Sequence, residues 1–147
     1  MFEIKKMTAE DADAVFEMAV QFYNSPAVHE PVAESVLKAT VEHAISPAEG
    51  FVGYVLLEDG KPVGFAYLTI FFETEVGGMC VMIEDLFFEK QCRGKGYGKA
   101  FFAFVFEQYQ SAKRFRLEVT PDNETAIGLY TKMGFEPLEY AQMVINK

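Results

Sequence analysis

The feature that most restricts the fold is an apolar segment that leads through a glycine-rich loop into a second apolar segment. Met79 to Phe88 is long enough for one strand and mostly apolar, as expected of a strand buried on both faces. The loop from Gln91 to Lys99 contains three glycines at alternate positions. Gly98 to Tyr109 then has helical periodicity and is apolar on nearly all sides, which indicates deep packing. Glycines between a buried strand and a buried helix allow the backbone to approach a ligand closely.

The other segments predict the remaining elements of a mixed α/β sandwich around one sheet. Asp59-Gly60 is a strong hairpin signal between two apolar, strand-like runs. The predicted order is β-α-α-β-β-β-α-β-α-β-β, in one domain over residues 1–147. Strands are predicted over 2–7, 51–58, 61–72, 79–88 and 115–119, with two more within 135–145, and helices over about 8–19, 31–44, 98–109 and 124–133.

Composition narrows the class of function. The net charge of −9 disfavours nucleic acid as a partner, because phosphate binding needs a basic surface. The two cysteines form no paired metal-binding motif, so no metal site is expected and a reducing compartment is favoured. Neither a signal peptide nor an apolar stretch of membrane-spanning length is present, so we expect a cytoplasmic protein with no membrane partner.

The glycine-rich loop concentrates positive charge in an acidic chain. Lys90, Arg93, Lys95 and Lys99 place four of the 13 basic residues within ten positions, and the start of a helix adds a positive dipole end. A phosphate-bearing ligand explains this concentration. The loop matches neither the Walker pattern nor the dinucleotide fingerprint, because its glycines are at the wrong spacing for both.

Two motifs resemble those of the GCN5-related N-acetyltransferase (GNAT) family. Gln91, Gly94 and Gly96 fill the cofactor-loop pattern Q/R-x-x-G-x-G/A. The segment from Asn123 to Phe135 is similar to the family pattern N-x-x-A-x-x-L-Y-x-x-x-G-F. The order of predicted elements also agrees, over most of the chain. The resemblance implies a mixed, mostly antiparallel central sheet flanked by helices, and acetyl-CoA as co-substrate.

The resemblance also assigns residues to acetyl-CoA. Tyr130 matches a tyrosine that lies near the thioester sulfur in the family, and it is our candidate for the general acid. The alternative is a core aromatic side chain whose hydroxyl finds some partner. Asn123 matches a position that contacts pantetheine, and it is an equally good helix N-cap. The residues implied in cofactor binding are Leu86, Phe87, Phe88, Gln91, Arg93, Gly94, Lys95, Gly96, Tyr97, Gly98, Lys99, Asn123 and Tyr130.

Two adjacent acids, Glu84 and Asp85, interrupt the apolar strand, and each is a candidate for the general base. Strand alternation is expected to send them to opposite faces, so that one faces the acceptor and the other has a structural role. Our prediction is that Glu84 takes the proton from the amine, made more basic by desolvation. With Glu73 and Glu75 nearby, the acids would form a negative pocket for a cationic amine. The alternative is that both acids only form structural salt bridges.

The function indicated is direct transfer of an acetyl group to a primary amine of a small molecule, polyamine-like or amino-acid-like. A weaker similarity to the polyamine and thialysine branch of the family points the same way. The alternatives are a protein lysine or N-terminal acetyltransferase and a non-catalytic acyl-CoA-binding module. A homodimer is compatible with this interpretation. Cys92, beside basic residues, is expected to have a lowered pKa but not to act as a nucleophile.

Overall fold

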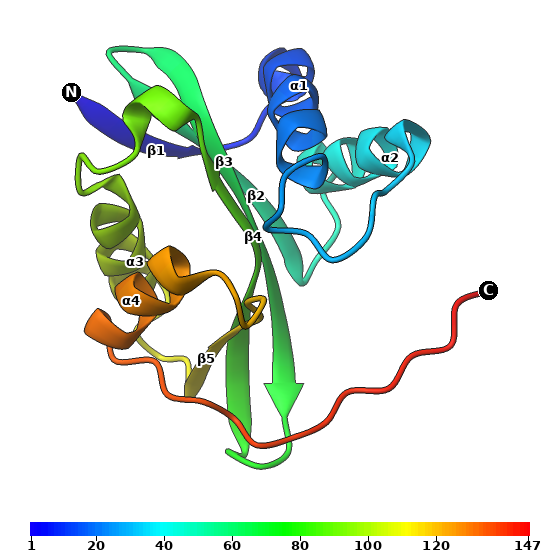
Figure 1. Cartoon of the computed structure of the whole chain (residues 1–147), viewed down its shortest axis with the longest axis vertical. Coiled ribbons are helices and arrows are strands. Elements are labelled where there is room, and N and C mark those ends of the chain that lie inside the picture. The colour runs from blue at the N-terminus through cyan, green and yellow to red at the C-terminus, as the bar shows by residue number, and fades with distance from the viewer.

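A computed structural model describes residues 1–147 and shows one five-stranded sheet with helices on both faces (Figure 1). The strands lie in the order β1-β2-β3-β4-β5, and all neighbours are antiparallel except β4 and β5, which are parallel. The elements are β1 (Phe2–Lys6), α1 (Ala12–Tyr23), α2 (Glu34–Ile45), β2 (Phe51–Glu58), β3 (Lys61–Glu73), β4 (Gly78–Phe88), α3 (Tyr97–Gln108), β5 (Arg114–Leu117) and α4 (Glu124–Lys132), with short 3-10 helices at Ala9–Asp11 and Lys90–Cys92.

The two faces of the sheet carry separate hydrophobic cores. Helices α1 and α2 cover one face, where Val15 and Leu37 pack with Phe65. Helices α3 and α4 lie on the other face, where Phe101 packs with Leu68. The mixed, mostly antiparallel fold predicted from the sequence is therefore confirmed. The sheet separates the two cores, so a side chain of β4 packs in one core or the other, depending on the face of the sheet on which it lies.

The β2–β3 hairpin confirms the turn signal in the sequence. Asp59 and Gly60 both have positive φ, 50° and 77°, as a two-residue turn of this twist requires. The turn places Glu58, the last residue of β2, at the same end of the sheet as the loop that follows β4.

Strands β4 and β5, the last two strands of the sheet, separate after a short contact, which exposes one backbone edge of β4. They pair only from Cys80 to Ile83 on β4, opposite Arg114 to Leu117 on β5. From Glu84 onward, β4 has a strand neighbour on the β3 side alone. Its other edge presents unpaired N–H and C=O groups to any extended ligand that enters the gap.

The two strands predicted within residues 135–145 are absent. The chain after α4 forms no helix or strand, although the sequence there is rich in residues that favour strands. A strand forms only where its backbone has a partner, and no segment of this chain lies paired with the tail. None of the helices has the length and hydropathy needed to cross a membrane.

Candidate active site

The loop after β4 forms an open cradle at the start of α3. Gly94 and Gly96 have φ values of 78° and 82°, a conformation that favours glycine, and a Cβ on either would meet no atom within 4 Å. No side chain caps the N-terminus of α3, so its first N–H groups remain free for an anion. Gly98 has a different role, because a Cβ there would come within 2.8 Å of Leu129 on α4.

The free edge of β4 runs into this cradle. Leu86 and Phe88 pack toward the α3 core, and Phe87 is buried in the α1–α2 core. The Phe88 carbonyl already accepts a 3.0 Å hydrogen bond from Arg93 Nε, so Arg93 secures the turn from strand to loop. The predicted cofactor residues on β4 therefore lie on both faces of the strand, and the chain leads from them directly into the loop.

An acid that was not predicted connects β2 to the cradle. Glu58 accepts a 2.7 Å hydrogen bond from Lys95 Nζ and a short one from Tyr97 Oη. These two hydrogen bonds hold the pKa of the Glu58 carboxyl below its ordinary value. Tyr97 also stacks on Phe2, with ring centroids 4.3 Å apart. Lys95 is thus paired with a carboxylate, whereas Lys99 has no hydrogen-bond or ion-pair partner in the chain and is exposed.

The expectation of a low-pKa thiol at Cys92 is wrong. Its side chain is buried, and burial together with the nearby Glu58 carboxylate raises the pKa of the thiol. The basic residues of the loop lie near Cys92 in sequence, but the charge closest to its sulfur is negative, with Glu58 Oε2 at 3.9 Å. Cys80 is likewise buried and unpaired.

The second motif forms α4 and its cap. Asn123 accepts a 3.2 Å hydrogen bond from the Ala126 N–H, which makes it the helix N-cap. Tyr130 packs edge-on against Phe102 and Phe135 in the α3 core, and burial raises the pKa of its hydroxyl. Tyr130 is one of the residues that line a cavity of about 1020 Å³ between β5 and α4.

A β-bulge places both acids of β4 on the same face, against the expectation from alternation. Tyr67 lies opposite Asp85, but its neighbour Leu68 lies opposite Ile83, so Glu84 is an extra residue without a partner on β3. Ile83 and Leu86 both pack toward α3, which is impossible without this extra residue between them. Glu84 accepts a 2.8 Å hydrogen bond from Thr69 and is exposed, so the desolvation expected of it is not found.

Asp85 is the desolvated acid of the pair. Tyr23 Oη, at the end of α1, donates a 2.7 Å hydrogen bond to its Oδ2. Burial raises the pKa of Asp85 to about 6, while the Tyr23 hydrogen bond opposes this rise and the Glu84 charge adds to it. Opposite Asp85 on β3, the Tyr67 hydroxyl is buried and has no hydrogen-bond partner. A carboxyl group whose pKa is raised to about 6 therefore lies opposite a buried hydroxyl that has no hydrogen-bond partner.

The predicted negative pocket is smaller than expected. Glu73 accepts hydrogen bonds from Arg114 at 2.9 Å and Arg116 at 3.3 Å, so β5 neutralises it. Glu75 lies within 3.8 Å of the same Arg114. Glu84 and Asp85 are left as the acids of the α1–α2 face of β4. No hydrogen bond joins either of them to Tyr130.

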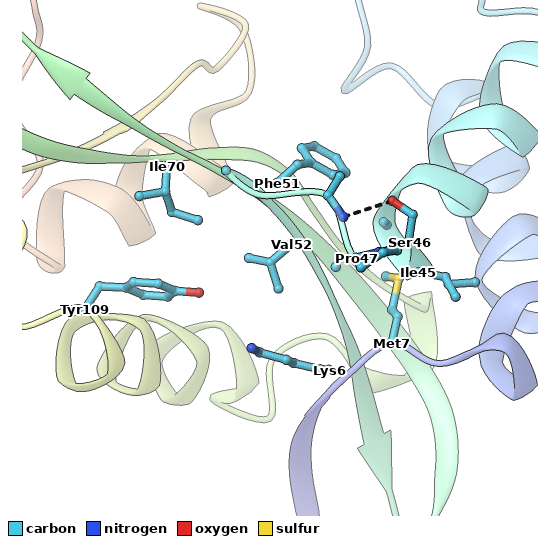
Figure 2. A pocket seen from close by; sticks show the side chains of 13 residues that line it. Lys6, Met7, Ile45, Ser46, Pro47, Phe51, Val52, Ile70 and Tyr109 are labelled. Atoms are coloured by element: carbon cyan, nitrogen blue, oxygen red, sulfur yellow. Dashed lines mark hydrogen bonds between the residues drawn. The ribbon is translucent and has the colours of Figure 1, made fainter.

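A second cavity lies away from these residues. A hollow of about 380 Å³ lies where the end of α2 meets the start of β2. Ser46 Oγ there accepts a 3.3 Å hydrogen bond from the Ala48 N–H, and Figure 2 shows the side chains around it. Phe51 and Val52 line it, at the end of β2 remote from Glu58. It contains none of the predicted site residues, so the cradle and the β4 acids remain the candidate site.

The comparisons with known proteins agree with this geometry. A Bacillus subtilis (strain 168) protein, provisionally named a [ribosomal protein bS18]-alanine N-acetyltransferase, is 25% identical over 136 residues, which cover 91% of this chain and 80% of that protein. A structure described as a possible acetyltransferase from Clostridium difficile 630 superposes with a TM-score of 0.85 at 17% identity, over 100% of this chain and 98% of the other.

The aminoglycoside acetyltransferase AAC(6')-Iy, solved with a CoA bisubstrate analogue of acetylneamine, gives a TM-score of 0.80 at 18% identity, over 100% of this chain and 99% of the other. Both structural likenesses establish the fold. A sequence profile of the acetyltransferase (GNAT) family matches residues 12–135, from the start of α1 to just beyond α4. With the cradle, the free edge of β4 and this match together, the chain belongs to the GNAT family of acetyltransferases, whose co-substrate is acetyl-CoA.

Proposed function

We propose that this enzyme transfers an acetyl group from acetyl-CoA directly to a primary amine of a small, cationic molecule, with Asp85 as general base and Tyr130 as general acid. The observation that carries the proposal is the hydrogen bond from Tyr23 on α1 to Asp85 on β4, at the point where the edge of β4 becomes free. A base with a pKa of about 6 is largely ionised near neutral pH and still accepts a proton readily.

The chemistry needs protons to be removed from the amine and a proton to be delivered to the sulfur. An alkylamine arrives protonated, because its pKa is about 10.4, and it must lose a proton before it attacks. Asp85 takes that proton, directly or through a water held by the free Tyr67 hydroxyl. The amine nitrogen then bonds to the acetyl carbonyl carbon, the carbon–sulfur bond breaks, and the departing thiolate takes the Tyr130 proton. The nitrogen gives up its second proton to the Tyr130 oxygen through water, which leaves the neutral amide and restores the tyrosine hydroxyl. Burial raises the pKa of the Tyr130 hydroxyl, so this group is protonated at neutral pH when the thiolate departs.

We assign Glu84 a binding role instead of the base role expected from the sequence. Its carboxylate is exposed and held by the Thr69 hydrogen bond, so it attracts a cationic amine with no desolvation cost to the carboxylate. Backbone amides from about Arg93 to Gly98 bind the pyrophosphate, and the β4 edge from Leu86 to Phe88 pairs with pantetheine. Cys80 and Cys92 are buried, which favours direct transfer over an acetyl-cysteine intermediate.

A second candidate acceptor is the N-terminal amine of a protein. The Bacillus subtilis relative supports it, since its name specifies the alanine of a ribosomal protein. The two acids of the β4 bulge favour the small cationic amine, because a protein N-terminus offers only one positive charge for two carboxylates. We also propose that residues 1–147 act as one domain, in the cytoplasm, where the two unpaired thiols stay reduced.

The test is a screen for amine-dependent CoA release with a thiol reagent. The panel contains a polyamine, an aminoglycoside, free lysine, an anionic amine and a peptide that begins with alanine. We expect the cationic small molecules to give the largest kcat/KM. A best substrate with net negative charge would contradict the proposed acceptor site, and preference for the peptide would favour the second candidate. No amine-dependent release from protein that binds acetyl-CoA would indicate a non-catalytic binding module.

A further inference from the structure

Two arginines of β5 lie on the same face of the sheet as the two acids of the β4 bulge. Phe115 and Leu117 pack toward the α3 core, so Arg114 and Arg116, which alternate with them, point to the opposite face. Both arginines donate hydrogen bonds to Glu73 of β3 on that face. Figure 1 shows α1 and α2 toward the other end of the sheet, away from β5. The arginine side chains therefore stay partly open to solvent.

Arg116 has hydrogen-bonding capacity that its own chain does not use. The buried Glu73 carboxylate is paired mainly with Arg114, at 2.9 Å, and Arg114 also lies 3.8 Å from Glu75. Arg116 makes a single, longer bond of 3.3 Å to the same Glu73 oxygen through Nη1, and its side chain is 29% exposed. Glu118, two residues further along, forms no ion pair with it. Because a guanidinium carries five N–H donors, most of those of Arg116 remain free for an anion from solution.

The register of β4 and β5 brings Arg116 within reach of the proposed base. Arg116 lies opposite Met82, and Asp85 is three residues further along β4, roughly 10 Å in an extended strand. The two strands separate between these points, so a ligand can lie along the gap. Arg116 also lines the cavity that Tyr130 lines. The face is thus positive at Arg116 and negative at Glu84 and Asp85, as a ligand with unlike charges at its two ends requires.

We propose that Arg116 binds a carboxylate of the acceptor, and that the acceptor is an amino acid with a second, basic amine, which is the amine acetylated. The inference rests on the proposed function and specifies its substrate class. In lysine the terminal amine and the carboxylate are roughly 7–8 Å apart in the extended form, by ordinary bond lengths. With a hydrogen bond at each end, such a molecule spans the interval from Asp85 to Arg116. The planar guanidinium matches a carboxylate with two parallel hydrogen bonds, whereas a polyamine brings a like charge to it.

The test compares three acceptors that share one terminal amine, by amine-dependent CoA release. Lysine has the carboxylate, lysinamide has a neutral amide in its place, and cadaverine has neither. We expect kcat/KM for lysine to exceed that for the other two by about 10–100-fold, as a charge-assisted hydrogen bond provides. Fragmentation of the product by mass spectrometry should locate the acetyl group on the ε-amine. Equal kcat/KM for lysine and lysinamide, or acetylation of the α-amine, overturns the proposal.

Substitutions identify the arginine responsible. Arg116→Gln should bring the three acceptors to similar kcat/KM, and Arg116→Lys, which keeps the charge, should retain part of the preference for lysine. Arg114→Gln is the matched control, because Arg114 lies on the same face and binds the same carboxylate, and it should keep the preference. A ratio of two substrates measured on one protein does not depend on the fraction that is folded. A full preference in Arg116→Gln, or an equal loss in Arg114→Gln, refutes the assignment.

Failure of this inference is distinguishable from failure of the proposed function. Turnover of cationic amines without any effect of the carboxylate overturns the role of Arg116 and leaves the acetyl transfer in place. Absence of turnover with every amine overturns the acetyl transfer, and calorimetry then tests Arg116 without catalysis. Lysine titrated into the CoA-bound protein should bind about 10–100-fold more weakly to Arg116→Gln than to the wild type. Equal affinity for the two proteins contradicts the carboxylate site.

Discussion

Replacement of Asp85 by Asn separates a catalytic carboxylate from a structural one. Asparagine has nearly the same shape, and its carbonyl oxygen still accepts the hydrogen bond from Tyr23. Only the ability to take a proton is lost. We expect kcat/KM to fall by about 10²–10⁴-fold, the usual contribution of a general base. In the wild type kcat/KM should rise with pH up to about 6, as Asp85 ionises, and the variant should lose this dependence.

The same substitution should stabilise the fold. The pKa of Asp85 rises from 3.8 to about 6 on folding, so the native state prefers the protonated carboxyl. This preference contributes stability that is fully present below pH 3.8 and is lost as the pH rises through about 6. At neutral pH the ionised form costs the native state up to about 3 kcal/mol, at about 1.4 kcal/mol per tenfold change. Asp85→Asn should therefore raise Tm near pH 7 by about 5–10 °C.

The assay is CoA release and thermal unfolding of both proteins across the acidic and neutral range. The Tm difference should vanish in acid, where wild-type Asp85 is also neutral. Asp13→Asn, an exposed acid on α1, is the matched control and should change neither quantity. A variant that keeps the wild-type pH–rate profile would remove Asp85 from the mechanism. A lower Tm at neutral pH would show that the ionised carboxylate supports the fold, contrary to the burial argument.

Four further outcomes are expected. Gly96→Asp should abolish acetyl-CoA binding by calorimetry, because it strains a residue with φ of 82° and adds negative charge at the cradle; unchanged affinity in a folded variant would refute the assignment. Tyr130→Phe should lower kcat and leave acetyl-CoA affinity nearly intact, whereas wild-type turnover under chemistry-limited conditions would mean that Tyr130 only packs. Glu58→Gln should release Lys95 for phosphate and lower the KM for acetyl-CoA about 2–5-fold, more at low salt, with kcat unchanged and Asp59→Asn as control; a raised KM would contradict this. Initial-rate plots should intersect, as direct transfer requires, and parallel lines would indicate an acetylated enzyme.

The sequence predicted the features that depend on local pattern. The hairpin at Asp59-Gly60 and the apolar β4 follow from turn chemistry and periodicity. The N-cap at Asn123 follows in the same way. These features needed no knowledge of what lies opposite in the fold, which is why they could be predicted.

The errors concern partners that are distant in sequence. Tyr23 and Asp85 are 62 positions apart, and nothing local shows that they meet. In the sequence, Glu58 is only the last residue before a predicted turn, and it is the fold that brings its carboxylate close to Lys95 and Cys92. The missing final strands have the same cause, because composition indicates the capacity to form a strand but not the presence of an edge to receive it.

The bulge on β4 gives the enzyme one position that can vary without disturbing its neighbours. Since Glu84 has no partner on β3, its deletion would leave Tyr67 opposite Asp85 and Leu68 opposite Ile83, with every other side chain on its present face. A change of residue at 84 therefore alters one side chain of the proposed acceptor site while the proposed base stays where it is. Acceptor preference can diverge during evolution, or be redirected by design, through this single position.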